Sequence, residues 1–258
     1  QMMLFFTKHN HINIVKQTKR TDDILGELYS DICDAYKYLE SMKKFKNYYN
    51  TTTKKIETLS QIPMPKYFNS NSFPEEVRKH IEQFATTEIT YTFSLYERKI
   101  KLIFVLEEHQ NTSKLDTFNK YVDAIIMWLF ILNKYSSKQC TNTLVSYFYF
   151  TSLTKNLPTS NMYILDQIHV NTAFTRTCPI DSEIIVFRKE EWFKVFIHET
   201  FHNFALDFSD MNNDIVHKCI LNIFKVQSDV NLYESYTEFW AEIMNALFCS
   251  FFSIPDKT

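Results

Sequence analysis

The sequence predicts an α+β fold, in which a small mixed or antiparallel sheet is backed by helices. Apolar side chains recur at helical spacing over residues 24–39, whereas they alternate with polar ones over residues 89–95. Two late segments, residues 189–207 and 233–252, have the pattern of amphipathic helices. The chain has 258 residues, 45% of them hydrophobic, which is enough for a sizeable core and excludes a disordered protein.

The first third of the chain is predicted to be helical. Residues 21–61 begin with acidic side chains and continue with Ile24, Leu28 and Ile32 at helical spacing, so we expect one long helix or two broken ones. Residues 62–74 contain three prolines and a polar cluster, which is typical of a linker, and residues 74–85 form a short helix. We therefore expect a helical N-terminal region over residues 1–85, of unassigned role, and a second domain over residues 86–258.

The second domain is predicted to mix strands and helices. Alternation on both sides of a turn at residues 96–99 predicts a β-hairpin, and residues 116–134 carry a long apolar helix. Later in the chain, segments rich in β-branched and aromatic residues predict strands, and segments with helical periodicity predict helices. The expected later strands cover residues 144–152, 168–175 and 183–188, and the expected later helices cover residues 189–207, 215–226 and 233–252.

Composition excludes several classes of function. The net charge of -2, from 28 basic and 30 acidic residues, provides no field for nucleic acid. The longest apolar run, residues 124–132, is far shorter than the ~20 residues that cross a bilayer, so we expect no membrane partner. The single glycine, Gly26, excludes phosphate loops and dinucleotide fingerprints, because these require several residues without a Cβ near the ligand.

The cysteines suggest neither a disulfide framework nor a thiolate zinc site. The five cysteines are scattered, odd in number and never in a CxxC pair. The first residues also lack the basic region and cleavage site of a secretory signal. We therefore expect a cytoplasmic or otherwise reducing compartment, and the bias toward Lys, Asn, Ile, Phe and Tyr suggests an AT-rich viral or parasite genome.

The most informative motif is HETFH, residues 198–202. Four residues advance an α-helix by about one turn, so His198 and His202 project from one face with rings close enough to share a metal. Glu199 lies ~100° further round, beside such a metal, where a general base for water is needed. The alternative is a helix that carries two partly exposed histidines without a metal.

The surrounding sequence favours a metal site. The apolar residues of this helix form a broad arc that leaves His198 and His202 largely outside its packing face. An upstream segment, residues 168–175, can serve as a sheet edge that binds a peptide by backbone hydrogen bonds. Downstream, Glu234, Glu238 and Glu242 follow at four-residue steps and can supply a third ligand and an orienting acceptor. The alternative for these glutamates is an ordinary solvated face, opposite an aromatic face expected to be buried.

Together, HETFH and the later EFWAE segment resemble the gluzincin zinc metallopeptidases, in particular the peptidase domain of anthrax lethal factor and its relatives. This resemblance implies a zincin-like fold, with an active-site helix and a C-terminal glutamate helix. It implies that His198, His202 and Glu238 bind zinc, that Glu199 is the general base, and that Glu242 orients a ligand histidine. Such enzymes often stabilise the transition state with a Tyr or His, for which Tyr233, Tyr236 and His217 are candidates; we select Tyr233.

Helical spacing alone places Glu234 and Glu238 on the same side of the last helix. We expect Glu238 to be the ligand, because only the Glu238/Glu242 pair encloses two aromatics and Ala241, which allows close helix approach. Glu234 also lies near the helix start, where fraying would loosen metal geometry.

The predicted function is zinc-dependent hydrolysis of peptide bonds in a protein or peptide substrate, by an endopeptidase. One alternative is an inactive zinc-binding module for interaction or structure, although a structural site needs no base such as Glu199. The other is a terminal-trimming carboxypeptidase or amidase, which a cation at one closed end of the cleft would favour.

Overall fold

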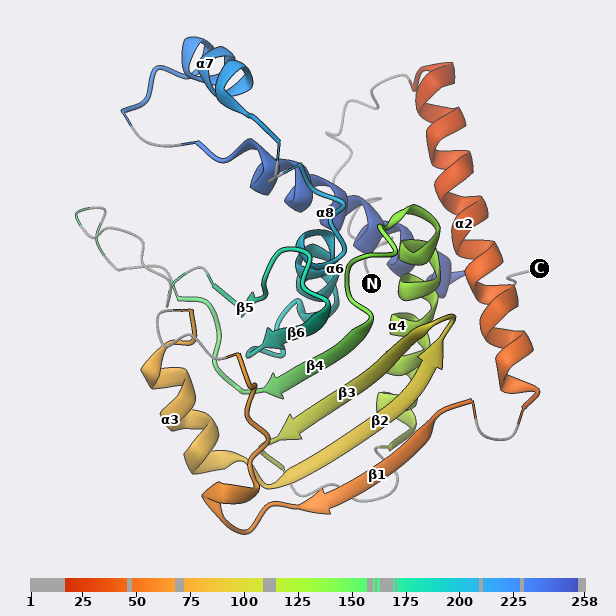
Figure 1. Ribbon diagram of the computed structural model, residues 1–258, viewed down its shortest axis with the longest axis vertical. Coiled ribbons are helices and arrows are strands. Elements are labelled where there is room, and N and C mark those ends of the chain that lie inside the picture. Colours follow the sequence, from red (N-terminus) through yellow and green to blue (C-terminus); the bar gives the residue numbers. More distant parts are fainter. Residues whose placement is uncertain are drawn as a thin grey trace, which may run out of the picture.

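The computed structural model confirms the α+β class (Figure 1). It describes residues 17–45, 48–67, 72–108, 115–156, 160, 162, 169, 171–208, 211–227 and 230–254. The helices are α2 (Lys19–Lys43), the 3-10 turn η1 (Leu59–Gln61), α3 (Glu75–Phe84), α4 (Leu115–Tyr135), α6 (Trp192–Asn203), α7 (Asp214–Ile223) and α8 (Leu232–Ser253). The strands are β1 (Asn50–Lys55), β2 (Thr87–Leu95), β3 (Arg98–Leu106), β4 (Thr143–Phe150), β5 (Ala173–Phe174) and β6 (Asp181–Val186).

The six strands form one mixed sheet in the order β1-β2-β3-β4-β6-β5. The predicted hairpin is confirmed as β2 and β3, which pair antiparallel. Strands β3, β4 and β6 run parallel, with α4 crossing between β3 and β4. The short strand β5 pairs antiparallel with β6 and forms an edge of the sheet, as predicted for residues 168–175, although residues 168 and 170 lie outside the described residues.

Side chains alternate between the two faces of the sheet along each strand, and both faces are covered. One face is covered by a core that includes residues of α2, α4, α6 and α8, and the other is covered by α3 together with Ile56, Ile62 and Phe73 (Figure 1). In β3, Phe104 belongs to the first core, whereas its neighbour Val105 belongs to the second. The four-helix layer brings α6 and α8 together.

The helical prediction for the N-terminal region is wrong over residues 50–55. These residues form β1, which pairs antiparallel with β2 in register from Asn50↔Thr92 to Lys55↔Thr87. Three consecutive threonines, Thr51–Thr53, favour an extended backbone because of their β-branched side chains. The sheet therefore continues across the domain boundary suggested near residue 85, since β1 precedes that boundary and β2 follows it.

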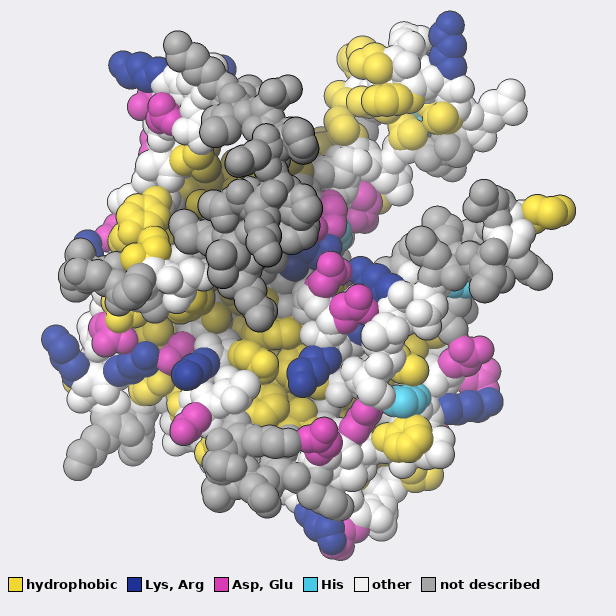
Figure 2. Space-filling view, turned by 180° about the vertical axis from the view of Figure 1, so that it is seen from behind, with side chains coloured by type: hydrophobic (Ala, Val, Ile, Leu, Met, Phe, Trp, Pro, Cys, Tyr) yellow, Lys and Arg dark blue, Asp and Glu magenta, His cyan; other side chains and the backbone are white. Residues whose placement is uncertain are grey.

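The predicted helix over residues 215–226 is observed as α7, which stands away from the sheet (Figure 1). None of its residues is buried, and apolar side chains gather on its surface (Figure 2). They include Ile215, 77% exposed, and Ile223, 71% exposed. Among the described residues, no helix combines the length and apolar character needed to cross a membrane.

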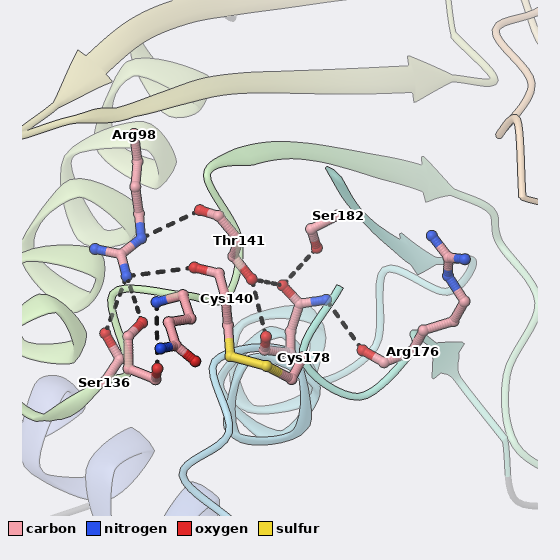
Figure 3. The surroundings of a disulfide bond; sticks show 10 residues. Arg98, Ser136, Cys140, Thr141, Arg176, Cys178 and Ser182 are labelled. Atoms are coloured by element: carbon pink, nitrogen blue, oxygen red, sulfur yellow. Dashed lines mark hydrogen bonds between the residues drawn. A yellow bond between two sulfur atoms is a disulfide. The ribbon is translucent and has the colours of Figure 1, made fainter. Parts of the chain in front are cut away.

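The cysteine pattern suggested no disulfide framework, but one disulfide is present among the described residues. Cys140 and Cys178 form a disulfide that joins the loop before β4 to the turn before β6 (Figure 3). The Cys178 N–H donates to the carbonyl of His202 at 3.2 Å, and Thr141 Oγ1 donates to the Asn203 carbonyl at 2.8 Å. The disulfide thus connects two turns that hold the end of α6. Disulfides are typical of oxidising environments, so the expected reducing compartment is not supported.

Candidate metal centre

Helix α6 is fixed by its apolar face. Phe196 and Ile197 are fully buried in the core, and Trp128 Nε1 of α4 donates a hydrogen bond of 2.8 Å to Thr200 Oγ1. Truncation of a buried phenylalanine such as Phe196 to alanine typically costs about 3–5 kcal/mol of stability. This packing directs the remaining side, with His198 and His202, toward α8.

Helix α8 packs through a different face from the one predicted. Thr237, Ala241, Met244, Phe248 and Phe251 are its buried residues. The aromatic face expected to be buried is partly open instead, with Phe239 58% exposed and Tyr236 36% exposed. The small side chain of Ala241 is fully buried, as a close approach between helices requires.

The two histidines and a glutamate converge between α6 and α8. His198 Nε2 and His202 Nε2 are 3.2 Å apart. Glu234 Oε2 lies 3.3 Å from the first of these nitrogens and 3.4 Å from the second. Ligand atoms of these three residues all lie within 4.8 Å of one another, so the group could hold a metal ion. The expected pairing of His198 with His202 is therefore present.

Glu238, the expected third member, occupies a different position. Its Oε2 lies 2.9 Å from Nδ1 of His198, on the other side of the ring, and its Oε1 lies 2.5 Å from Lys194 Nζ. Glu242, expected to orient a histidine, instead lies 3.5 Å from Lys194 Nζ. The geometry thus gives the orienting position to Glu238 and the converging position to Glu234, because Glu234 is the glutamate directly opposite both imidazoles.

The second histidine has an acceptor that the sequence analysis missed. Asp207 Oδ2 lies 2.5 Å from Nδ1 of His202, and the Asp207 side chain is 1% exposed. The chain reverses after α6 because Ala205 adopts a left-handed conformation with φ of 54°. An acidic residue shortly after the end of the histidine helix was the signal available in the sequence. Each histidine therefore has a carboxylate on Nδ1, which leaves Nε2 directed toward the shared group.

The carboxylates strongly affect protonation of this group. Burial acts to lower the pKa of His198, but hydrogen bonds to Glu234 and Glu238 raise it to about 9. The pKa of His202 is raised in the same way, by Glu234 and Asp207 against burial. Hydrogen bonds to both histidines lower the pKa of Glu234 to about 2, and the hydrogen bond to His198 lowers that of Glu238 to about 2. The site therefore attracts positive charge at neutral pH.

Glu199 lies beside this group, as the helical spacing predicts. It is 9% exposed, and burial raises the pKa of its carboxyl to about 7, a value suited to a general base. It lines a cleft of about 910 Å³. The cleft lies between α6, α8 and the edge strand, and its lining includes Thr172, Ala173, His198, Glu199, Glu234 and Phe239.

The three candidates for transition-state stabilisation lie in different surroundings. The Tyr233 ring is 6.3 Å from the His202 ring, between centroids, in an edge-to-face arrangement. Tyr236 packs against Phe208, with ring centroids 5.1 Å apart. His217 Nε2 accepts a hydrogen bond of 3.4 Å from the Val230 N–H. Tyr233 is therefore the candidate with a direct ring contact to the histidine pair.

No protein-family model, no curated protein and no solved structure matches this chain significantly. The site geometry therefore carries the functional argument alone.

Proposed function

We propose that the protein is a zincin-like, zinc-dependent endopeptidase of the gluzincin type. One observation carries the proposal. Two imidazole Nε2 atoms and the Glu234 carboxylate converge at the wall of a cleft, with the buried carboxyl of Glu199 on the same wall. This combination of a three-residue ligand set and a nearby base is typical of catalytic zinc sites.

The chemistry of the donor atoms fits zinc. Two imidazole nitrogens and one carboxylate oxygen are ligands that zinc prefers, and three protein ligands leave a position open for water or substrate. Asp207 and Glu238 each accept from Nδ1 of one histidine, which fixes the tautomer that a zinc ligand requires. When bound, zinc supplies a Lewis acid that polarises a carbonyl and makes water more acidic.

The protein's own residues complete the reaction. Glu199 accepts a proton from the attacking water and then transfers it to the leaving amine, so the carboxylate is regenerated in each cycle. Its burial keeps competing solvent away from the proton. Tyr233 donates a hydrogen bond to the carbonyl oxygen as negative charge develops there.

The sheet edge supports an extended peptide as substrate. Thr172 O accepts a hydrogen bond of 2.9 Å from the Phe187 N–H, and Ala173 is opposite Val186 in the antiparallel register. Backbone groups alternate in direction along a strand, so those of Ala173 point away from β6. Since Ala173 lines the cleft, its N–H and C=O can bind a peptide backbone by strand addition.

Terminal trimming is less well supported than internal cleavage. A carboxypeptidase needs a cation to bind the terminal carboxylate. The cleft contains Lys155 and Lys194, but Lys155 Nζ lies 3.0 Å from Glu191 and Lys194 Nζ lies 2.5 Å from Glu238. Both cations among the described lining residues are therefore already paired with carboxylates.

The proposal is tested with a peptide library and mass spectrometry of the products. We expect zinc-loaded wild-type protein to cleave internal bonds, and Glu199→Gln to bind one zinc per chain yet cleave nothing, since an amide cannot accept the proton. Glu82→Gln makes the same change at an exposed position of α3, which packs on the opposite face of the sheet, and should retain full activity. Equal cleavage by wild-type protein and Glu199→Gln would exclude Glu199 as the base. Wild-type protein that retains no zinc after incubation with zinc would exclude the metal centre.

A further inference from the structure

Helices α6 and α8 face each other through two rows of side chains, each with one residue per turn. The α6 row is Lys194, His198 and His202, and the α8 row is Glu234, Glu238 and Glu242. The two rows are staggered, so that a side chain of one row can contact two of the other. Glu234 contacts both histidines, Glu238 contacts His198 and Lys194, and Glu242 contacts Lys194.

Glu234 and Glu238 are otherwise similar. They are one turn apart on the same side of α8, and both side chains are 45% exposed. Both also lie within reach of the His198 ring, Glu234 at Nε2 and Glu238 at Nδ1. The difference lies on α6, where Glu234 is opposite a second histidine and Glu238 is opposite a lysine.

Lys194 is an unusual residue for this position. Its side chain is 9% exposed, and a buried ammonium is tolerated only with close anionic partners. Its nearest partner is Glu238 Oε1 at 2.5 Å, with Glu242 at 3.5 Å and Glu191 at 4.0 Å. Glu238 therefore has one oxygen held by Lys194 and the other by His198 Nδ1.

We propose that Lys194 is a positioning residue that determines which glutamate completes the metal site. It holds Glu238 against His198 Nδ1 as an orienting acceptor, and thereby leaves the ligand position to Glu234. The inference rests on the proposed metal centre but concerns zinc binding and not hydrolysis. Without the cation at position 194, we expect the Glu238 carboxylate to turn from Nδ1 of His198 toward the metal.

The test is a set of zinc affinities, measured by competition with a chromophoric chelator. In the wild-type background, Glu234→Ala should lower the affinity by at least about 100-fold, because one of three ligands is lost. In a Lys194→Met background, Glu234→Ala should cost no more than roughly 10-fold, because Glu238 then replaces it; residues in one network couple in this way. Lys194→Arg retains the cation and should behave as wild type.

A third substitution identifies the replacement ligand. Adding Glu238→Ala to the Lys194→Met/Glu234→Ala variant should remove the recovered affinity. An equal cost of Glu234→Ala in both backgrounds would overturn the role of Lys194, and so would recovery that persists without Glu238. Melting curves of the zinc-free variants report folding, and Lys194→Ala replaces Lys194→Met if that variant does not fold. Wild-type protein that binds no zinc overturns the metal centre together with this inference, whereas zinc binding without coupling overturns this inference only.

Discussion

The Asp207 carboxylate and the His202 imidazole are joined by a 2.5 Å hydrogen bond between Oδ2 and Nδ1, although His202 lies within α6 and Asp207 follows the end of that helix. The left-handed Ala205 between them reverses the chain and brings the buried carboxylate back to the ring. Nε2 of His202 is thereby kept available for a metal.

Loss of this carboxylate should weaken zinc binding. Asp207→Asn keeps the shape of the side chain but removes the charge, and we expect zinc affinity to fall by about 10- to 100-fold. Chelator competition measures the change. Asp34→Asn, which neutralises an exposed aspartate on α2, should leave the affinity unaltered. Similar affinities for the two variants would contradict an orienting role of Asp207.

Zinc affinity should increase with pH up to about 9. The pKa of His198 is raised to about 9, so below that pH zinc must displace a proton, and affinity should rise by up to about tenfold per pH unit for each proton displaced. A raised histidine pKa stabilises the zinc-free protein fully below the ordinary value near 6.5, and this contribution is lost as the pH rises through about 9. The increase in melting temperature on adding zinc should therefore grow over this range.

Calorimetry in buffers of different ionisation enthalpy directly measures the number of protons that are released when zinc binds. Glu238→Gln removes a hydrogen bond that raises the pKa of His198, so it should move the pH dependence to lower pH. A pH-independent affinity between pH 6.5 and 9 would disprove the assignment of His198 as a ligand.

Tyr233→Phe should slow hydrolysis without releasing zinc. The phenol hydroxyl is expected to donate to the developing oxyanion, and loss of one such donor typically lowers kcat by about 10²- to 10³-fold. Tyr236→Phe is the matched control, because the Tyr236 ring packs against Phe208, whereas the Tyr233 ring contacts that of His202. The comparison uses kcat and zinc content together; equal rates for both variants would remove Tyr233 from the mechanism.

Opening the disulfide should destabilise the protein. Cys140 and Cys178 are separated by 38 residues, and closing a loop of this length contributes roughly 3–4 kcal/mol in the chain-entropy account. Urea unfolding of Cys140→Ser/Cys178→Ser, compared with Cys219→Ser/Cys249→Ser at two exposed free cysteines, measures the difference. Alkylation of the unfolded chain should label three cysteines without a dithiol reductant and five with it. Labelling of all five without reductant would show that the bond is absent.

Local patterns in the sequence were sufficient for most secondary structure and for half of the candidate site. Alternation over residues 89–95 predicted a strand of the hairpin, and the four-residue step from His198 to His202 placed both imidazoles on one side of α6. These predictions hold because strand and helix periodicities are properties of a single segment. Residues 50–55 show the limit, since the pairing of β1 with β2 outweighs a pattern that was read as helical.

The remaining features depend on how segments pack together. The Cys140–Cys178 disulfide joins two distant turns, and Asp207 reaches His202 only because the chain reverses at Ala205. The choice between Glu234 and Glu238 also could not be made from their common spacing on α8. Only the tertiary structure distinguishes their surroundings, because the position of α8 along α6 sets Glu234 opposite two imidazoles and Glu238 opposite an imidazole and the buried ammonium of Lys194.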